Sequence, residues 1–91
     1  MELKRLKDLC AAIAKLETPA EAQRFLIDLC TPDELASMAG RWGAARLLDK
    51  GVPYREIYAK TGVSTATVTR VARALVYGKS GYRLILDRIK K

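Results

Sequence analysis

Small hydroxyl side chains and guanidinium groups gather in residues 61–75, which read TGVSTATVTRVARAL. The apolar residues of this stretch recur at i, i+3, i+4 and i+7, the spacing of one buried helix face. They are Val68, Val71, Ala72 and Leu75. The opposite face therefore carries hydroxyls, methyl groups and positive charge, which can contact base edges and phosphates in the major groove of DNA. The outward residues are Thr65, Ala66, Thr69, Arg70 and Arg73, with Thr67 at the boundary.

Two short helices joined by a tight turn would position this face. Residues 53–61 and 65–77 are predicted to be helical, and Gly62 stands where the first helix would end in a left-handed residue. Ser64 is the expected N-cap of the second helix, because its hydroxyl can accept a hydrogen bond from a free backbone amide. At that place it can also contact a phosphate. The layout predicts a helix-turn-helix with residues 65–77 as the recognition helix.

The basic character of the chain belongs to its second half. Residues 1–49 hold seven Lys or Arg against eight Asp or Glu, a net charge of −1, whereas residues 50–91 hold ten against two, a net charge of +8. This asymmetry favours a polyanionic partner, most often nucleic acid; the alternative is a solvated surface that maintains solubility. Further candidate phosphate contacts are Arg55, Lys60 and Lys79, each of which alone is equally well explained as a solvated charge.

The residues that usually carry catalysis or bind metal are scarce. The chain has no histidine, and its two cysteines, Cys10 and Cys30, do not form a CxxC pair. Four metal ligands cannot be assembled, and the commonest general base is missing. We therefore expect no enzyme, no metal and no cofactor, with both cysteines as buried free thiols in a reducing compartment.

The whole chain reads as one all-α domain, residues 1–91, without strands. Thr18-Pro19-Ala20-Glu21 and Thr31-Pro32-Asp33-Glu34 each place Thr at an N-cap, Pro at the first helical position and Glu at the third, which marks two helix starts. Helices are predicted at about 2–16, 19–30, 32–50, 53–61, 65–77 and 80–90.

The helices of residues 1–50 have more apolar surface than a chain of 91 residues is expected to cover by itself. We expect these helices to form a homodimer, with residues 53–77 as the helix-turn-helix and 80–90 as a C-terminal helix. The alternative is that all of this surface packs within one chain. Trp42 is expected in the core or dimer interface, and Gly40 and Gly43 beside it would allow close helix approach across a dimer.

No apolar run approaches the roughly 18 residues that span a bilayer. The first 16 residues, MELKRLKDLCAAIAKL, carry charges throughout and lack the apolar core of a signal peptide. We expect no membrane partner and a cytoplasmic location.

The segments LCTPDELASMAGRWGAARLLDKG and YREIYAKTGVSTATVTRVARAL resemble the Trp repressor superfamily, and more closely its YerC/YecD-like branch. The resemblance implies an intertwined homodimer whose two helix-turn-helix units meet successive major grooves of double-stranded DNA, and hence a sequence-specific transcriptional regulator, most simply a repressor. It also implies that Arg55 reads a base. The recognition-helix contact positions are matched by Thr65, Ala66, Thr67 and Thr69.

The founding member of this superfamily binds L-tryptophan between two arginines, which Arg41 and Arg70 match, and Thr31 matches another pocket position. Three pocket positions differ: a glycine is replaced by Val71, a serine by Ala74 and a leucine by Asp28. A polar ligand group buried without a partner costs about 1–3 kcal/mol. These changes disfavour tryptophan as corepressor. There are three alternatives. A different small molecule binds in the pocket, or Val71 fills the pocket, or Arg41 and Arg70 bind phosphates instead.

Two other functions compete with a sequence-specific regulator. One is a helical adaptor whose basic face binds an acidic protein. The other is an architectural DNA-binding protein with little sequence preference.

Overall fold

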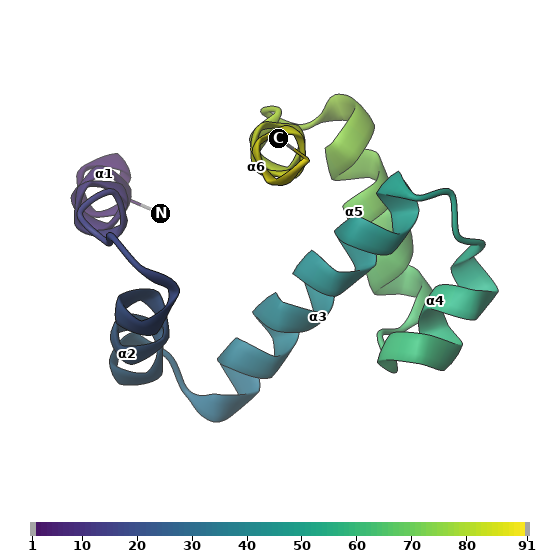
Figure 1. The fold of residues 1–91 in the computed structure, drawn as a ribbon, viewed down its shortest axis with the longest axis horizontal. Helices are drawn as coiled ribbons and strands as arrows, with labels where there is room; N and C mark the ends of the chain where they lie inside the picture. Colours follow the sequence, from purple (N-terminus) through teal and green to yellow (C-terminus); the bar gives the residue numbers. More distant parts are fainter. Residues whose placement is uncertain (1, 91) are drawn as a thin grey trace. The chain divides into compact units, whose positions relative to one another are not determined.

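The computed structural model describes residues 2–90, which form six α-helices and no strand (Figure 1). They are α1 (Leu3–Ile13), α2 (Pro19–Leu29), α3 (Pro32–Asp49), α4 (Tyr54–Thr61), α5 (Thr65–Tyr77) and α6 (Gly81–Ile89). The predicted all-α class with six helices is confirmed.

The largest difference from prediction is the end of α1, which was expected near residue 16 and lies at Ile13. The amides of Lys15 and Leu16 bind carbonyls three residues back, each at 3.0 Å, so the chain tightens into a turn. Thr18 is then extended, as the residue before a proline prefers to be, with φ −135° and ψ 157°. The helix must therefore end before Thr18 and Pro19.

Both predicted Thr-Pro-x-Glu helix starts are present. The amide of Glu21 donates to Thr18 Oγ1 at 3.1 Å, and the amide of Glu34 donates to Thr31 Oγ1 at the same distance. At α3 the box is reciprocal, because the Thr31 amide donates to Glu34 Oε1 at 2.8 Å. This backbone hydrogen bond lowers the pKa of Glu34, since it stabilises the carboxylate.

Residues 2–35 and 36–90 form two compact units, called here the N-terminal and the C-terminal unit. The core of the C-terminal unit joins the second half of α3 to α4 and α5 through Ala44, Ile57 and Val68, each fully buried. Four half-buried apolar residues surround these three: Leu47, Leu48, Val52 and Val63. α5 also packs against α6. Trp42 of α3 is half-buried and stacks on Tyr82 of α6, with ring centroids 6.4 Å apart. The two rings therefore pack α3 against α6.

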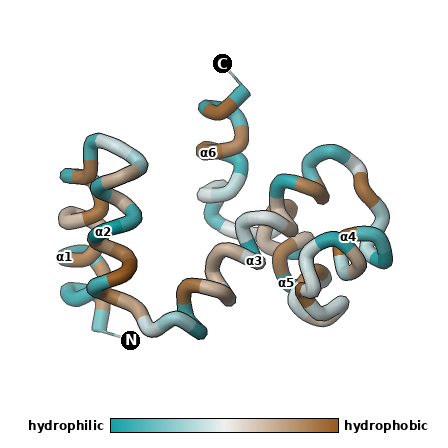
Figure 2. Tube along the Cα trace, turned by 60° about the horizontal axis from the view of Figure 1, so that its bottom comes forward, coloured by the Kyte–Doolittle hydropathy of each residue, from teal (hydrophilic) through white to brown (hydrophobic). Residues whose placement is uncertain are grey.

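The helices of the N-terminal unit bury none of their residues within the chain. Hydrophobic bands run along α1 and α2 (Figure 2), and the large apolar side chains left exposed there are Leu3, Leu6, Ile13, Ile27 and Leu29. Cys10 and Cys30 are free thiols. The expected burial of Cys10 is wrong for the single chain, because nothing covers its part of α1, whereas Cys30 is half-buried.

Gly40 allows a close contact inside the C-terminal unit. A Cβ atom at this position would lie 2.9 Å from Val63 Cγ2, at the end of the α4–α5 turn. At Gly43 a Cβ would meet nothing within 4 Å. Gly40 was expected to allow two helices to approach closely across a dimer. In the single chain, the close contact at Gly40 is with Val63 of the same chain.

Asp49, the last residue of α3, ties that helix to α6. Its Oδ1 lies 2.8 Å from Arg83 Nη1 and its Oδ2 lies 2.8 Å from Lys90 Nζ, while the side chain is only 10% exposed. The hydrogen bonds from Lys90 and Arg83 lower the pKa of Asp49. The two cations thus hold both ends of α6 on one carboxylate.

This carboxylate should make stability depend on pH. Because the pKa of Asp49 is lower in the folded chain than in the unfolded one, its contribution is present above the ordinary value of about 3.9 and is lost as pH falls through the lowered value. We expect Asp49→Asn to lower the urea midpoint near pH 6 and to flatten its fall toward about pH 3.

Circular dichroism during urea unfolding measures both effects. Asp87→Asn is the matched control, because Asp87 lies 3.6 Å from Arg83 in an exposed pair. A pH profile of Asp49→Asn that followed the wild type would contradict the assigned role.

Candidate nucleic-acid interface

The turn between α4 and α5 is built by Gly62. It has φ 74°, in the left-handed region that favours glycine, and its amide donates to Tyr58 O at 2.8 Å. The Thr61 hydroxyl donates to Ile57 O at 2.7 Å and accepts from the Val63 amide at 3.1 Å. The predicted helix end at Gly62 is confirmed, and α4 and α5 form a helix-turn-helix unit (Figure 1).

Ser64 caps α5, as predicted. Its Oγ accepts a hydrogen bond from the Thr67 amide at 3.2 Å, and its hydroxyl donates to Thr67 Oγ1 at 3.0 Å. The first turn of α5 is thus held by hydrogen bonds between Ser64 and Thr67. A contact from Ser64 to a phosphate stays a prediction.

The two faces of α5 are those that the apolar spacing predicts. Val68 and Val71 are 0% and 1% exposed, and Ala72 and Leu75 are half-buried. Thr67 is half-buried at the boundary. The exposed members of the predicted contact set on this helix are Thr65, Ala66, Thr69, Arg70 and Arg73. That these residues contact DNA stays a prediction.

Two of these residues already have partners in the chain. The Thr69 hydroxyl donates to Thr65 O at 2.9 Å, so its oxygen remains available as an acceptor and its methyl group is held in one place. The guanidinium of Arg73 lies over the ring of Tyr77, 5.9 Å from its centroid, in a cation–π contact. Arg73 is thereby directed toward the C-terminal end of α5.

The three candidate phosphate contacts outside α5, which are Arg55, Lys60 and Lys79, differ in their surroundings. Lys60 Nζ lies 3.5 Å from Glu56 Oε1 in an exposed pair, which is worth little and can open when a phosphate approaches. Arg55 on α4 and Lys79 after α5 are exposed, and neither has an ion-pair partner within residues 2–90. Arg55 and Lys79 are therefore free to meet an anion.

The residues that match a corepressor pocket have other surroundings in the single chain. Arg41 Nη1 donates to Ser37 Oγ at 3.0 Å on α3, Arg70 lies on the exposed face of α5, and Thr31 caps α3 in the N-terminal unit. Val71, which stands where the family pattern has glycine, is buried within the chain. Its side chain therefore occupies core space.

A hollow of about 310 Å³ lies where the α4–α5 turn meets α3. It is lined by Ala36, Ser37, Gly40, Thr61, Gly62, Val63, Ser64 and Thr67. The spacing within α5 could not predict this hollow, because Ser37 and Gly40 reach it from a helix far away in sequence. The hydroxyls of Thr61, Ser64 and Thr67 already take part in the hydrogen bonds of the cap and turn. The Ser37 hydroxyl oxygen accepts a hydrogen bond from Arg41.

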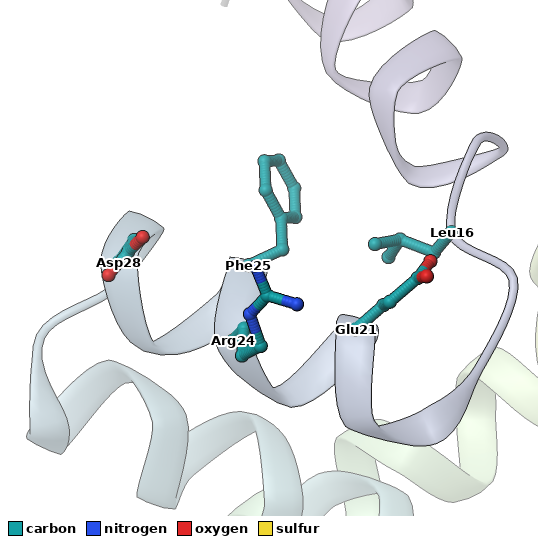
Figure 3. A pocket seen from close by; sticks show the side chains of 5 residues that line it. All are labelled: Leu16, Glu21, Arg24, Phe25 and Asp28. Carbon is teal, nitrogen blue, oxygen red and sulfur yellow. The ribbon is translucent and has the colours of Figure 1, made fainter.

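A second hollow, of about 380 Å³, lies in the N-terminal unit (Figure 3). Leu16 and Phe25 supply apolar side chains, and Glu21, Arg24 and Asp28 supply charges of both signs. Glu21 is already engaged, since its Oε1 accepts the Glu17 amide at 3.0 Å. The mixed charges do not select a ligand of one sign, so we leave this hollow outside the candidate interface.

Sequence reasoning missed two exposed tyrosines beside the candidate contacts, Tyr54 and Tyr58 on α4. Their i, i+4 spacing, which places both on one side of the helix, was the available signal.

None of the helices in the described part of the chain is long and apolar enough to cross a bilayer.

The fold and this surface define an all-α protein built around a helix-turn-helix unit. The chain belongs to the Trp repressor family. The sequence pattern of that family, described as Trp repressor protein, matches residues 4–90. It is 44% identical to the uncharacterized protein YerC of Bacillus subtilis over 88 residues, which cover 97% of this chain and 85% of YerC. Over 54 residues, 58% of this chain and 54% of the relative, it is 46% identical to a Trp operon repressor homolog of Actinobacillus succinogenes.

Two solved structures have the same fold. A TrpR-like protein of Eubacterium eligens superimposes with a TM-score of 0.90 at 37% identity, covering 98% of this chain and 92% of the other. A Staphylococcus aureus protein provisionally named a Trp repressor gives a TM-score of 0.90 at 38% identity, covering 98% and 89%. The resemblance expected from the sequence is confirmed.

The left-handed conformation of Gly62 predicts how substitutions of the turn act. A Cβ at this position meets no atom within 4 Å, so a substitution is penalised by backbone strain rather than by a clash. We expect Gly62→Ala to lower the free energy of unfolding by about 1–2 kcal/mol. Gly62→Asn should cost less, because asparagine tolerates this region.

Urea unfolding at one fixed protein concentration measures the two differences. If Gly62→Ala and Gly62→Asn were both as stable as the wild type, the turn would not depend on this conformation.

Proposed function

We propose that this chain is a homodimeric, sequence-specific DNA-binding transcriptional regulator, most simply a repressor. The single observation that carries the proposal is the exposed face of α5, where threonines, an alanine and arginines lie opposite the buried Val68 and Val71. Short side chains at the start of a helix allow its backbone to approach base edges, and the capped turn before it holds that start in place.

In the proposed complex, the N-terminal half of α5 enters the major groove. Thr65, Ala66, Thr67 and Thr69 contact base edges or thymine methyl groups, and Arg55 of α4 reads a base as in the family pattern. The remaining basic and polar candidates bind phosphates and set the salt dependence of affinity. They are Lys60, Ser64, Arg70, Arg73 and Lys79.

The exposed apolar helices support a homodimer. A chain of this size buries a smaller fraction of its surface than a larger domain does, and α1 and α2 leave several large apolar side chains uncovered. In the proposed arrangement, residues 1–50 join two copies, residues 53–77 bind DNA and residues 80–90 complete a single domain. Two recognition helices would meet half-sites about one helical turn apart.

The net charge of +8 in residues 50–91 favours nucleic acid over a neutral partner. We place the protein in the cytoplasm, because the proposed function requires access to DNA. Tryptophan is not proposed as an effector, because Val71 fills core space where the family pattern leaves room.

Specific binding should depend on the threonine and arginine contacts. Selection from random duplexes in moderate salt, without added ligand, is expected to enrich a palindrome. On that duplex, Thr69→Ala and Arg55→Ala should each weaken binding by about 1–3 kcal/mol with the far-UV circular dichroism unchanged.

Lys7→Ala is the control, because Lys7 lies exposed on α1, outside the proposed interface. A wild-type protein that bound the selected and a scrambled duplex equally would refute the proposal. Capture of a stable acidic protein with no duplex enriched would support the adaptor instead.

Dimerisation should be visible in the stability of the chain. If folding is coupled to association, the urea midpoint rises with protein concentration. Leu6 is 40% exposed in the single chain, and we expect Leu6→Gln to cost about 2 kcal/mol because its side chain is buried in the dimer.

Lys7→Gln introduces the same residue at the next position and should change stability by less than about 0.5 kcal/mol. A monomer by sedimentation, with midpoints independent of concentration, would contradict the homodimer.

A further inference from the structure

Two tyrosines stand on the outer surface of α4 without a role in the chain. Tyr54 is 44% exposed and Tyr58 is 54% exposed. Within residues 2–90 no acceptor receives a hydrogen bond from either phenol. Large aromatic residues exposed as a pair are unusual on a helix whose buried contact is made by Ile57 alone.

The helical repeat places this pair next to Arg55. At 3.6 residues per turn, Tyr54 and Tyr58 are separated by about 40° around the axis of α4, and Arg55 follows Tyr58 by about 60°. The three residues therefore form one continuous side of the helix. We call this side the tyrosine side of α4.

The charge on α4 is separated in the same way. Glu56, the acidic residue of this helix, lies roughly opposite the tyrosine side, about 160° from Tyr58, where it pairs with Lys60 at 3.5 Å. An anion that approaches Tyr54 and Tyr58 thus meets Arg55 and no carboxylate of α4. This side favours a negatively charged partner with hydrogen-bond acceptors.

We propose that Tyr54 and Tyr58 bind the DNA backbone, each phenol donating a hydrogen bond to a phosphate oxygen. This inference rests on the proposed function, because it needs α5 in the major groove. In a helix-turn-helix the first helix crosses the backbone while the second reads the groove, and tyrosine is among the residues that bind phosphates. The two rings supply contact area at a small cost in conformational entropy, since each has two side-chain torsions.

A phenol and an arginine leave different signatures in the salt dependence of binding. A neutral hydroxyl neutralises no phosphate charge, so its removal weakens affinity without changing the number of counterions released. Removal of an arginine that binds a phosphate weakens affinity and also lowers the slope of log K against log salt. The tyrosine side should therefore contribute affinity that persists at high salt.

The test uses the full chain and the duplex enriched by selection. Tyr54→Phe and Tyr58→Phe should each raise Kd by roughly threefold to tenfold while the salt slope stays that of the wild type. Arg73→Ala should lower the slope by roughly one, because one phosphate is then no longer neutralised by the protein. Far-UV circular dichroism checks that each variant is folded.

Tyr77→Phe is the matched control, because Tyr77 is a still more exposed tyrosine at the far end of α5, and phenylalanine keeps the ring under Arg73. Phenylalanine variants at 54 and 58 that bind as tightly as the wild type would overturn this inference alone. So would a change in salt slope, or an equally weakened affinity in Tyr77→Phe. A wild type that selects no duplex would instead remove the proposed function, and this inference with it.

Discussion

The burial of Ile57 and Val68 against Ala44 is the contact on which the helix-turn-helix depends. It joins α3, α4 and α5 in a core of few residues, and it decides which side of α5 faces outward. Because a helix presents opposite sides at fixed angles, burying Val68 and Val71 leaves the threonines and arginines of α5 exposed. The chemistry of the surface is thus set by the packing behind it. Gly40 is part of this constraint, since any side chain there would press on Val63 at the turn.

Charge is arranged around this core in two ways. Asp49 is held by Arg83 and Lys90, so part of the positive charge of the second half of the chain is used to fasten α6. Arg55, Arg70 and Lys79 are exposed without ion-pair partners within the described residues, and Arg73 lies over an aromatic ring. The net charge alone would therefore overstate the positive surface that a polyanion meets. Among the exposed cations without an ion-pair partner in the described residues, Arg55, Arg70 and Lys79 lie on or beside the two helices of the helix-turn-helix, whereas others, such as Lys50 and Arg88, lie elsewhere.

Features set by neighbours in sequence could be predicted, and features set by distant contacts could not. Thr18, Thr31 and Ser64 cap their helices through residues three positions away, so the pattern of types was sufficient. Asp49 accepts a hydrogen bond from Arg83, a residue 34 positions along the chain, and no local pattern encodes this contact. The exposure of Cys10 was missed for the same reason, because an apolar stripe predicts that a face is buried and leaves open which chain buries it. In the candidate interface, the apolar spacing predicted the exposed face of α5, whereas the two tyrosines of α4 were missed although their i, i+4 spacing places them on one side of the helix.

The recognition helix is poorly suited to be a helix by itself, and this links its function to the core. Six of its 13 residues are β-branched, and such residues lose side-chain freedom in a helix. The Ser64 cap and the packing of Val68 and Val71 must offset that cost. The threonines suit a groove because they are short and carry both a methyl and a hydroxyl group, so the composition that favours DNA contact is also the one that weakens the isolated helix. The order of the proposed reading surface therefore depends on one cap and on a few buried residues, and the buried residues themselves do not reach DNA.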